Sequence, residues 1–396
     1  MQSIQIEVED PKQKPPGRPL FALGFRPFFL AAGISAVVLM LGLVVAQATN
    51  IWHYNYFDMM VWHGHEMLFG FAAAVIAGFL LTAVRNWTGL ETATGSKLKW
   101  LVILWICGRL APAIPGLPLV LVASIDLAFL PALAAVLSQP LLKAGQVRNY
   151  FVLPVLILLT FANGLVHAEV LGFSMDTAQV GLYLAVYIVV LLIAIVSGRV
   201  MPFFTERAIT GFTASRWPWL EALSYAGIGV FAIADLLLPD APATAWIALA
   251  VALIHAVRLY SWGCWKAWKN PMLSVLYLAY AWLVAGFVLY ALSAVGFIAK
   301  AQALHAFTAG AIGMFTLGMM ARVALGHTGR PILASKAIVA AFGLVFFAAV
   351  LRIFSDEDVA EGFAAASGLI WSMAFLIFAV VYIPILIRPR ADGRPG

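Results

Sequence analysis

The chain alternates between long apolar segments and short polar connections along nearly its whole length. A helix needs about 20 predominantly apolar residues to cross the hydrocarbon core of a membrane. The pattern therefore predicts an all-α, polytopic membrane protein with twelve transmembrane helices. These segments cover about 25–47, 59–84, 99–113, 117–138, 150–171, 177–199, 217–238, 243–264, 273–296, 301–325, 335–354 and 363–387.

Lysine and arginine concentrate in every second connection between these segments, whereas the intervening loops are acidic. Of the 24 Lys and Arg residues, only Arg109, Lys300 and Arg352 fall outside that set. Because positively charged loops remain in the cytoplasm, the alternation predicts that both termini are cytoplasmic. The expected organisation is a disordered cytoplasmic arm over 1–22, a membrane domain over 23–388 and a cytoplasmic tail over 389–396.

Composition excludes a soluble domain with a single membrane anchor. Apolar residues make up 63% of the chain and charged residues only 11%, against roughly 25% charged residues in soluble proteins. The net charge of +6 reflects membrane topology and does not indicate a nucleic-acid partner. The expected partner is the lipid bilayer. The absence of a C-x-x-C-H sequence excludes covalent c-type haem by that motif.

The second apolar segment carries ionisable side chains where hydrocarbon is expected. Within Val61–Gly89, the first turns contain His63, His65 and Glu66, and such groups inside a membrane are functional-site candidates by default. The predicted topology places His63, His167 and His305 each about four residues from the outer end of its helix, roughly 6 Å deep. Three helices thus bring a histidine to one layer.

Two of these histidines face different surroundings. His63 and His65 are two residues apart, about 200° around a helix, so they cannot ligate one ion together. Glu66 and Met67 are expected on the face of His63, where the carboxylate would orient its imidazole. Either the two histidines serve two centres, His65 with His167 or His53, or one of them is a ligand and the other supports that ligand or packs between helices. For His53 and His167, an ordinary loop or interhelical hydrogen-bonding role remains the alternative.

Imidazoles with few carboxylates nearby suit haem iron, copper or zinc. Haem fits best, because its macrocycle fills space between apolar helices and arginines pair with its propionates; Arg109 is the expected partner on the outer side. His255, near the midplane, and His327, at the cytoplasmic helix end, are candidates for another haem or for structural contacts. The buried acids Asp126 and Asp235 either bind protons or pair with a neighbouring arginine.

Several short pieces spread over nearly the whole chain are specific as a set. They are Gly24–Phe29, Trp62–Phe71, Asn86–Gly89, Gly198–Thr205, His255–Arg258, Leu304–Ala306 and Gly326–Arg330. In these pieces the sequence resembles the NnrS family, bacterial membrane proteins linked to the nitric oxide response. The resemblance implies a haem- and copper-containing protein of the inner membrane that protects against nitrosative stress.

A more distant likeness links His63-Gly64-x-x-Met67-x-Phe69 to the helix-two haem motif of haem–copper oxidase subunit I. In that superfamily, histidines of helices two and ten hold a low-spin haem. The depth argument selects the same two helices. The superfamily's helix-ten His-x-His pair and its helix-six and helix-seven copper histidines are missing, so a usual oxidase or proton pump is not expected.

Two hypotheses follow. In the first, His63 and His305 are axial ligands of haem b near the periplasmic side, and His65 serves a second centre, such as copper. Nitric oxide would be the ligand or substrate, converted, bound or sensed, with an unknown electron donor. The alternative is a twelve-helix secondary transporter without haem. The predicted helix count and the buried charges of this chain are also typical of secondary transporters. An absorption spectrum distinguishes them.

Overall fold

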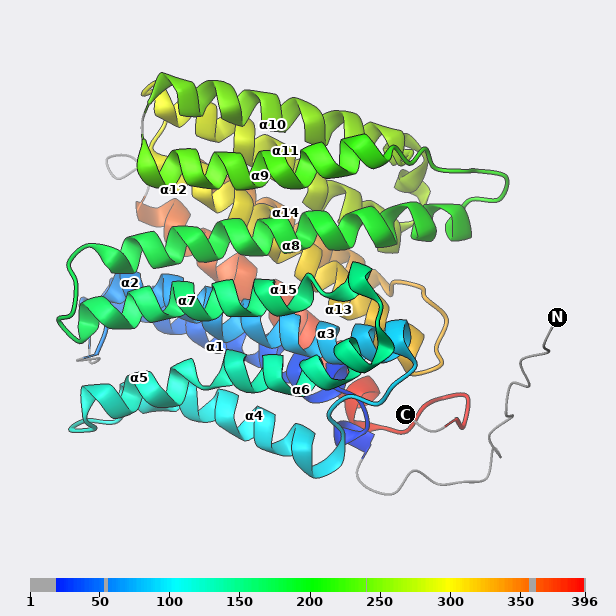
Figure 1. The fold of residues 1–396 in the computed structure, drawn as a ribbon, viewed down its shortest axis with the longest axis horizontal. Helices are drawn as coiled ribbons and strands as arrows, with labels where there is room; N and C mark the ends of the chain where they lie inside the picture. The colour runs from blue at the N-terminus through cyan, green and yellow to red at the C-terminus, as the bar shows by residue number, and fades with distance from the viewer. Residues whose placement is uncertain (1–18, 53–55, 240, 356–360, 395–396) are drawn as a thin grey trace.

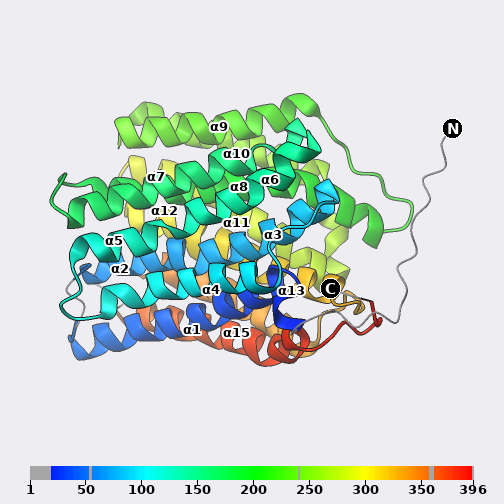
Figure 2. The same cartoon turned by 60° about the horizontal axis from the view of Figure 1, so that its bottom comes forward.

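The computed structural model describes residues 19–52, 56–239, 241–355 and 361–394, which form a bundle of roughly parallel and antiparallel helices (Figures 1 and 2). The described residues contain no β-strand. Most of the arm expected over 1–22 lies outside the described residues, and Pro19–Phe21 form a short 3₁₀ helix. The all-α fold predicted from the sequence is confirmed.

Each of the twelve predicted segments coincides with helical structure. Among the described residues, eleven helices are long and apolar enough to cross a membrane. The predicted third segment is α4, which has 16 residues, about 24 Å by the rise of an α-helix. The elements are η1 (Pro19–Phe21), α1 (Phe25–Thr49), α2 (Met59–His65), η2 (Glu66–Ala72), α3 (Ala73–Thr88), α4 (Gly95–Leu110), η3 (Ala111–Ala113), α5 (Leu119–Leu127), α6 (Phe129–Ala144), η4 (Val147–Asn149), α7 (Val152–Val170), α8 (Thr177–Ala208), α9 (Pro218–Leu237), α10 (Pro242–Ser261), η5 (Cys264–Lys269), α11 (Pro271–Ala294), α12 (Lys300–His305), η6 (Ala306–Ile312), α13 (Gly313–His327), α14 (Lys336–Ile353) and α15 (Glu361–Ile387).

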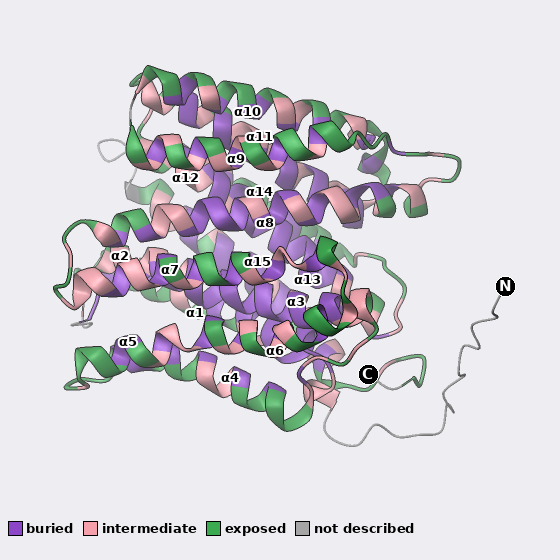
Figure 3. Cartoon of the chain, viewed as in Figure 1, coloured by how far each residue is buried: buried purple, intermediate pink, exposed green. Residues whose placement is uncertain are grey.

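Three spans form the centre of the bundle. Their apolar stretches are 89% buried in Met59–Thr88, 78% in Lys300–His327 and 67% in Thr177–Ala208, and no other span exceeds 56%. We call these three spans the inner helices; they are the second, tenth and sixth of the twelve. Figure 3 shows buried residues concentrated along α3, α8 and α13, with exposed residues on the outer helices. Helices apolar on all sides are expected in such a protected position.

Two of the inner helices contain a π-helical segment. These segments, Glu66–Ala72 and Ala306–Ile312, begin directly after His65 and His305. Corresponding residues are 240 positions apart (66 against 306). A π-helix hydrogen-bonds over five residues and changes which side chains share a face, and such segments often occur at functional sites.

The same spacing relates the ends of these helices. The hydroxyls of Thr88 and Thr328 each donate to the carbonyl four residues earlier, at 2.7 and 2.6 Å. Each is followed by a glycine with positive φ, +71° at Gly89 and +69° at Gly329. Left-handed glycines commonly end helices in this way. The second and tenth spans therefore share an internal structural repeat.

The first and last spans lie side by side, and α1 packs against α15. Nη1 of Arg26 donates to the carbonyl oxygens of Leu386 and Arg388, both at 2.8 Å. The described C-terminal residues thus lie at the same end of the bundle as the start of α1 (Figure 1). Which side of a membrane that end faces remains a prediction from the loop charges.

Candidate functional site

A cavity of about 220 Å³ lies between the inner helices, near the end at which Met59–Thr88 and Lys300–His327 begin. We call it the outer cavity. Its polar wall comes from α2, α12, α14 and α15, and most of the remaining wall is apolar. The lining residues important here are His63, Met67, Tyr183, His305, Arg352 and Trp371.

The imidazole of His305 has a defined tautomer. Its Nδ1 lies 2.6 Å from the carbonyl oxygen of Ala301, which only accepts hydrogen bonds, so Nδ1 carries the hydrogen. Its Nε2 accepts from Nε of Arg352 at 3.1 Å. The lone pair of Nε2 is therefore the group that His305 presents to a donor or a metal.

Other groups lining the outer cavity lack protein partners. Among the described residues, His63 has no hydrogen-bond partner, and Nε1 of Trp371 is buried without one. No ion pair within the described ranges neutralises Arg352. Two imidazoles, one cation and apolar walls fit a flat apolar cofactor with anionic groups, and haem has those properties with imidazole as a usual iron ligand.

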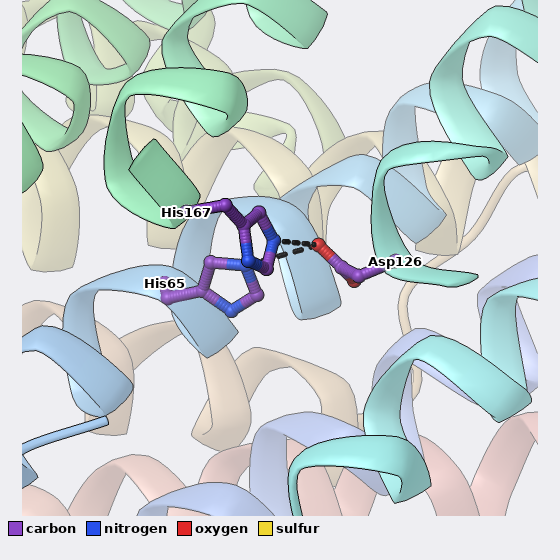
Figure 4. A group of neighbouring side chains, drawn as sticks. All are labelled: His65, Asp126 and His167. Carbon is purple, nitrogen blue, oxygen red and sulfur yellow. Dashed lines mark hydrogen bonds and ion pairs between the residues drawn. The ribbon is translucent and has the colours of Figure 1, made fainter. Parts of the chain in front are cut away.

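A second group of polar side chains lies buried beside the outer cavity. His65, Glu66, Asp126, Asn163 and His167 are all at most 3% exposed. Figure 4 shows the imidazoles of His65 and His167 together, opposite Asp126. Their Nε2 atoms lie 3.1 and 2.9 Å from the same oxygen, Oδ2 of Asp126. One ligand atom from each of these three residues lies within 4.8 Å of the others.

His65 faces more acceptors than a neutral imidazole can satisfy. Nδ1 lies 3.1 Å from a carboxylate oxygen of Glu66. Nε2 faces Asp126, and it also lies 3.0 Å from Oδ1 of Asn163. The amide of Asn163 is oriented by its Nδ2, which donates to Asp126 at 2.7 Å. Since neutral histidine has only one N–H, these contacts require a further proton, on His65 or on one of the carboxylates, or a bound cation.

The remaining contacts hold both imidazoles in place. Oε1 of Glu66 accepts from His65, and the hydroxyl of Tyr56 lies 2.7 Å from Nδ1 of His167. Burial raises the pKa of Tyr56, so its phenol stays protonated at neutral pH. Such partners at the second ring nitrogen are usual for metal-ligating histidines. The donor set of two imidazoles and one carboxylate fits a divalent transition metal.

The cluster also carries an excess of negative charge. Arg109 donates to Glu66 at 2.9 Å and pairs with Asp126. One guanidinium thus faces two carboxylates. A protonated His65 or a bound cation restores the balance, and buried charges are stable only when paired. We call Tyr56, His65, Glu66, Arg109, Asp126, Asn163 and His167 the polar cluster.

The structure separates the predicted residues into these two sites. His63, Met67 and His305 line the outer cavity, whereas His65 and His167 belong to the polar cluster. His53 lies outside the described residues. Two predicted roles change: Glu66 contacts His65 and not His63, and Arg109 pairs with Glu66 and Asp126 and does not line the outer cavity.

The other predicted residues lie elsewhere. His255 is buried against the hydroxyl of Tyr280 at 2.6 Å and the carbonyl of Ser224 at 3.3 Å. His327 lines a cavity at the opposite end of the inner helices. Asp126 pairs with an arginine, Arg109, as one of the two alternatives expected. Asp235 pairs instead with a lysine, Lys300, at 2.6 Å.

Sequence reasoning missed Arg352, Tyr56 and Asn163 as site residues. Arg352 had a usable signal, since it is one of three cations that depart from the loop-charge pattern. The other two departures, Arg109 and Lys300, also pair with buried acids. Tyr56 and Asn163 carry no local signal, because their partners come from other helices.

Comparison with known families supplies one match. A family model described as "NnrS protein" matches residues 19–390, nearly the whole chain. A search of curated proteins finds no match.

Proposed function

The chain belongs to the NnrS family, and from this we propose that it is a membrane protein of the nitric oxide response that binds haem and a second metal. The observation that carries the proposal is the pairing of His63 and His305 at one apolar cavity, from two inner helices. The family match supports the physiological role, and the geometry supports the cofactor sites.

In this proposal the outer cavity would hold haem b, with His63 and His305 as the residues that would supply nitrogen ligands to its iron. Haem supplies a redox-active iron with affinity for nitric oxide when it is bound. Nε2 of His305 is available only after Arg352 releases it, because the two are hydrogen-bonded here. The released guanidinium is then free to pair with carboxylates at the cavity wall, the role expected of Arg109 from sequence.

The second metal, copper in this proposal, is held in the polar cluster by His65, His167 and Asp126. Glu66 and Tyr56 hold the outer ring nitrogens of the two histidines, which orients their Nε2 atoms toward Asp126. Arg109 pairs with both carboxylates but balances only one of their two charges, and the bound ion would balance the other. Asn163 orients both Asp126 and His65.

The outer cavity and the polar cluster would have different roles. Two histidine ligands at one iron leave no open position, so the outer cavity favours electron transfer and the polar cluster favours contact with nitric oxide. Whether the gas is reduced, oxidised, bound or sensed depends on an electron donor of unknown identity. We place the chain in the bacterial inner membrane with both termini in the cytoplasm, because its basic residues gather on alternate connections.

An absorption spectrum of the purified protein, made with adequate haem supply, tests the proposal. A Soret band is expected in the full-length chain, and His305→Ala is expected to remove or shift it. His255→Gln is the control, because it also removes an imidazole from the bundle but His255 does not line the outer cavity. A spectrum unchanged by His305→Ala would refute the pairing of His63 with His305.

A haem-free secondary transporter is the second candidate, and the paired π segments favour it. Irregular segments at corresponding positions of repeated elements mark transporter binding sites. These segments nevertheless remain helical and leave no unwound backbone at mid-membrane. Complete absence of a Soret band in haem-replete protein would support this candidate over the first.

A further inference from the structure

A second cavity lies at the opposite end of the inner helices and is larger than the outer one. It has a volume of about 370 Å³ and is lined by side chains of α3, α8 and α13. We call it the inner cavity. Phe79, Trp87, Phe203, Phe204 and Met319 supply much of its apolar wall. Neither the outer cavity nor the polar cluster includes any of these residues.

Positive charge at the inner cavity has no acidic partner in the described parts of the chain. Arg199 lines the cavity, and its hydrogen bonds go to neutral groups, Oδ1 of Asn149 and the carbonyl of Arg148. Arg322 is only 9% exposed, and its Nε is buried with no hydrogen-bond partner among those residues. Its guanidinium carbon lies 3.7 Å from the ring centre of Phe204 in the cavity wall. Uncompensated buried charge is costly, so an anionic ligand is expected nearby.

A histidine completes the set. His327 lines the inner cavity, and its imidazole packs against the ring of Phe25, with the ring centres 5.7 Å apart. Its one side-chain hydrogen bond among the described residues is weak, because Nδ2 of Asn86 donates to Nε2 at 3.4 Å. This distance is long for such a bond, so a stronger ligand can displace the amide. The backbone carbonyl of His327 is fixed separately, since it accepts from Arg390 at 3.0 Å. The backbone of His327 is therefore held by Arg390, whereas the hydrogen bond to its Nε2 is weak.

We propose that the inner cavity binds a carboxylate-bearing tetrapyrrole, a second haem, with His327 as its nitrogen ligand and Arg199 and Arg322 as the cations facing its carboxylates. An anionic lipid explains the arginines but not the imidazole set among aromatic walls. A neutral quinone explains the imidazole but leaves both charges uncompensated. The tetrapyrrole accounts for the imidazole, the charge and the apolar walls together.

This site is independent of the first. His305 and His327 lie at opposite ends of the tenth span, 22 residues apart in the chain, or roughly 30 Å along a helix. Between the two cavities lies a small apolar one of about 50 Å³, lined among others by Val75, Phe79 and Phe315. A haem at one end therefore does not require a haem at the other.

Haem stoichiometry tests the proposal on the full-length protein. Haem per chain would be measured by the pyridine haemochrome method in the wild type, His327→Gly, His305→Ala and the His255→Gln control. If both haem sites exist, the wild type should hold two equivalents and each of the first two variants should lose one. If only the inner site exists, the wild type holds one equivalent, His327→Gly loses it and His305→Ala keeps it. That result would refute the outer site while supporting this one.

Two further measurements separate a ligand role from a structural one. Added imidazole should restore the missing spectrum of His327→Gly, because it can enter the space left by the side chain. Ala83→Phe should displace the same haem while keeping His327, since Ala83 lines the cavity. An unchanged haem ratio in His327→Gly would overturn the proposal. So would a loss that imidazole fails to restore, or a wild type with one haem that only His305→Ala removes.

Discussion

Arg352 donates its Nε hydrogen to Nε2 of His305 at 3.1 Å, which joins α14 to the tenth span across the wall of the outer cavity. The guanidinium therefore blocks the ring nitrogen that an iron ligand would use. It also brings a positive charge to this cavity that no carboxylate in the described segments pairs with.

Removing this charge is expected to lower the reduction potential of a haem in the outer cavity, because a nearby cation disfavours the more positive ferric state. Two charges roughly 10 Å apart at an effective dielectric constant of 20 interact by about 1.7 kcal/mol. That corresponds to a fall of roughly 70 mV for one electron in Arg352→Gln. Redox titration of the Soret band measures it. Arg352→Lys retains the charge and serves as the control; an equal fall in both variants would contradict the electrostatic origin.

Replacement of His167 should remove the second metal but leave the outer cavity unaffected. In His167→Ala the polar cluster loses one of three candidate ligands, and we expect the metal content per chain to fall by about one equivalent. Elemental analysis of the purified protein gives this value. The haem spectrum of the same sample should match the wild type. His255→Gln should retain the metal, and retention by His167→Ala would rule out His167 as a ligand.

Asp126→Asn should destabilise the fold in addition to weakening metal binding. The substitution leaves Arg109 with a single carboxylate partner inside the bundle. Because Glu66 still pairs with Arg109, the cost stays below the roughly 3–5 kcal/mol of a fully broken buried ion pair. The hydrogen bonds of Asp126 with Asn163 and His167 are disturbed as well. A clear drop in the thermal unfolding midpoint in detergent is expected. Glu206→Gln is the comparison, because the pair of Glu206 with Arg216 is largely exposed, and such pairs contribute about 0–1 kcal/mol. Equal midpoints for both variants would count against the buried pair.

The C-terminal tail should stay fastened at neutral pH and loosen in acid. Arg390 donates to Asp392 at 2.9 and 2.6 Å and also holds the carbonyl of His327. These hydrogen bonds lower the pKa of Asp392 below its ordinary 3.8. A depressed carboxyl pKa stabilises the folded state above the ordinary value, and this stabilisation is lost as pH falls through the folded-state pKa.

Hydrogen exchange at the amide of Ala391 reports this directly, because that amide donates to the carbonyl of Thr328 at 2.9 Å. Protection should be constant from pH 8 to 5 and fall below about pH 3.8. Asp392→Asn should already show weakened protection at neutral pH. Protection that is insensitive to both changes would show that the pair does not hold the tail.

The sequence predicted the helices well, because twelve apolar segments and the alternation of charged loops are local patterns. It also paired His63 with His305 by depth alone. Depth depends only on the number of residues from a helix end, so it survives small changes in helical twist. Both histidines accordingly line one cavity.

The angular prediction for Glu66 was less successful. On an α-helix Glu66 lies about 60° around the axis from His63, and Met67, the next residue, does line the outer cavity with His63. The carboxylate of Glu66 instead reaches His65 and Arg109. Arg109 comes from α4, and no pattern within the second segment identifies that partner.

The roles of interhelical partners such as Arg352 and Asn163 could not be predicted from the sequence for another reason. Their roles depend on which outer helix packs beside which inner helix. Arg352 reaches His305 from 47 residues further on, and Asn163 reaches His65 across 98 residues. Hydropathy fixes which segments span the membrane but says nothing of their neighbours in the plane.

The contact between the first and last spans has a consequence for biosynthesis. The α1 helix leaves the ribosome first, yet its neighbour α15 follows after roughly 300 further residues. At a synthesis rate of about 5–20 residues per second, that delay is on the order of 15–60 s. During this interval the side of α1 that later contacts α15 faces lipid or an insertion factor. That side includes the guanidinium of Arg26, which in the folded protein donates to the carbonyls of Leu386 and Arg388. The contact between α1 and α15 forms only after α15 has been synthesised.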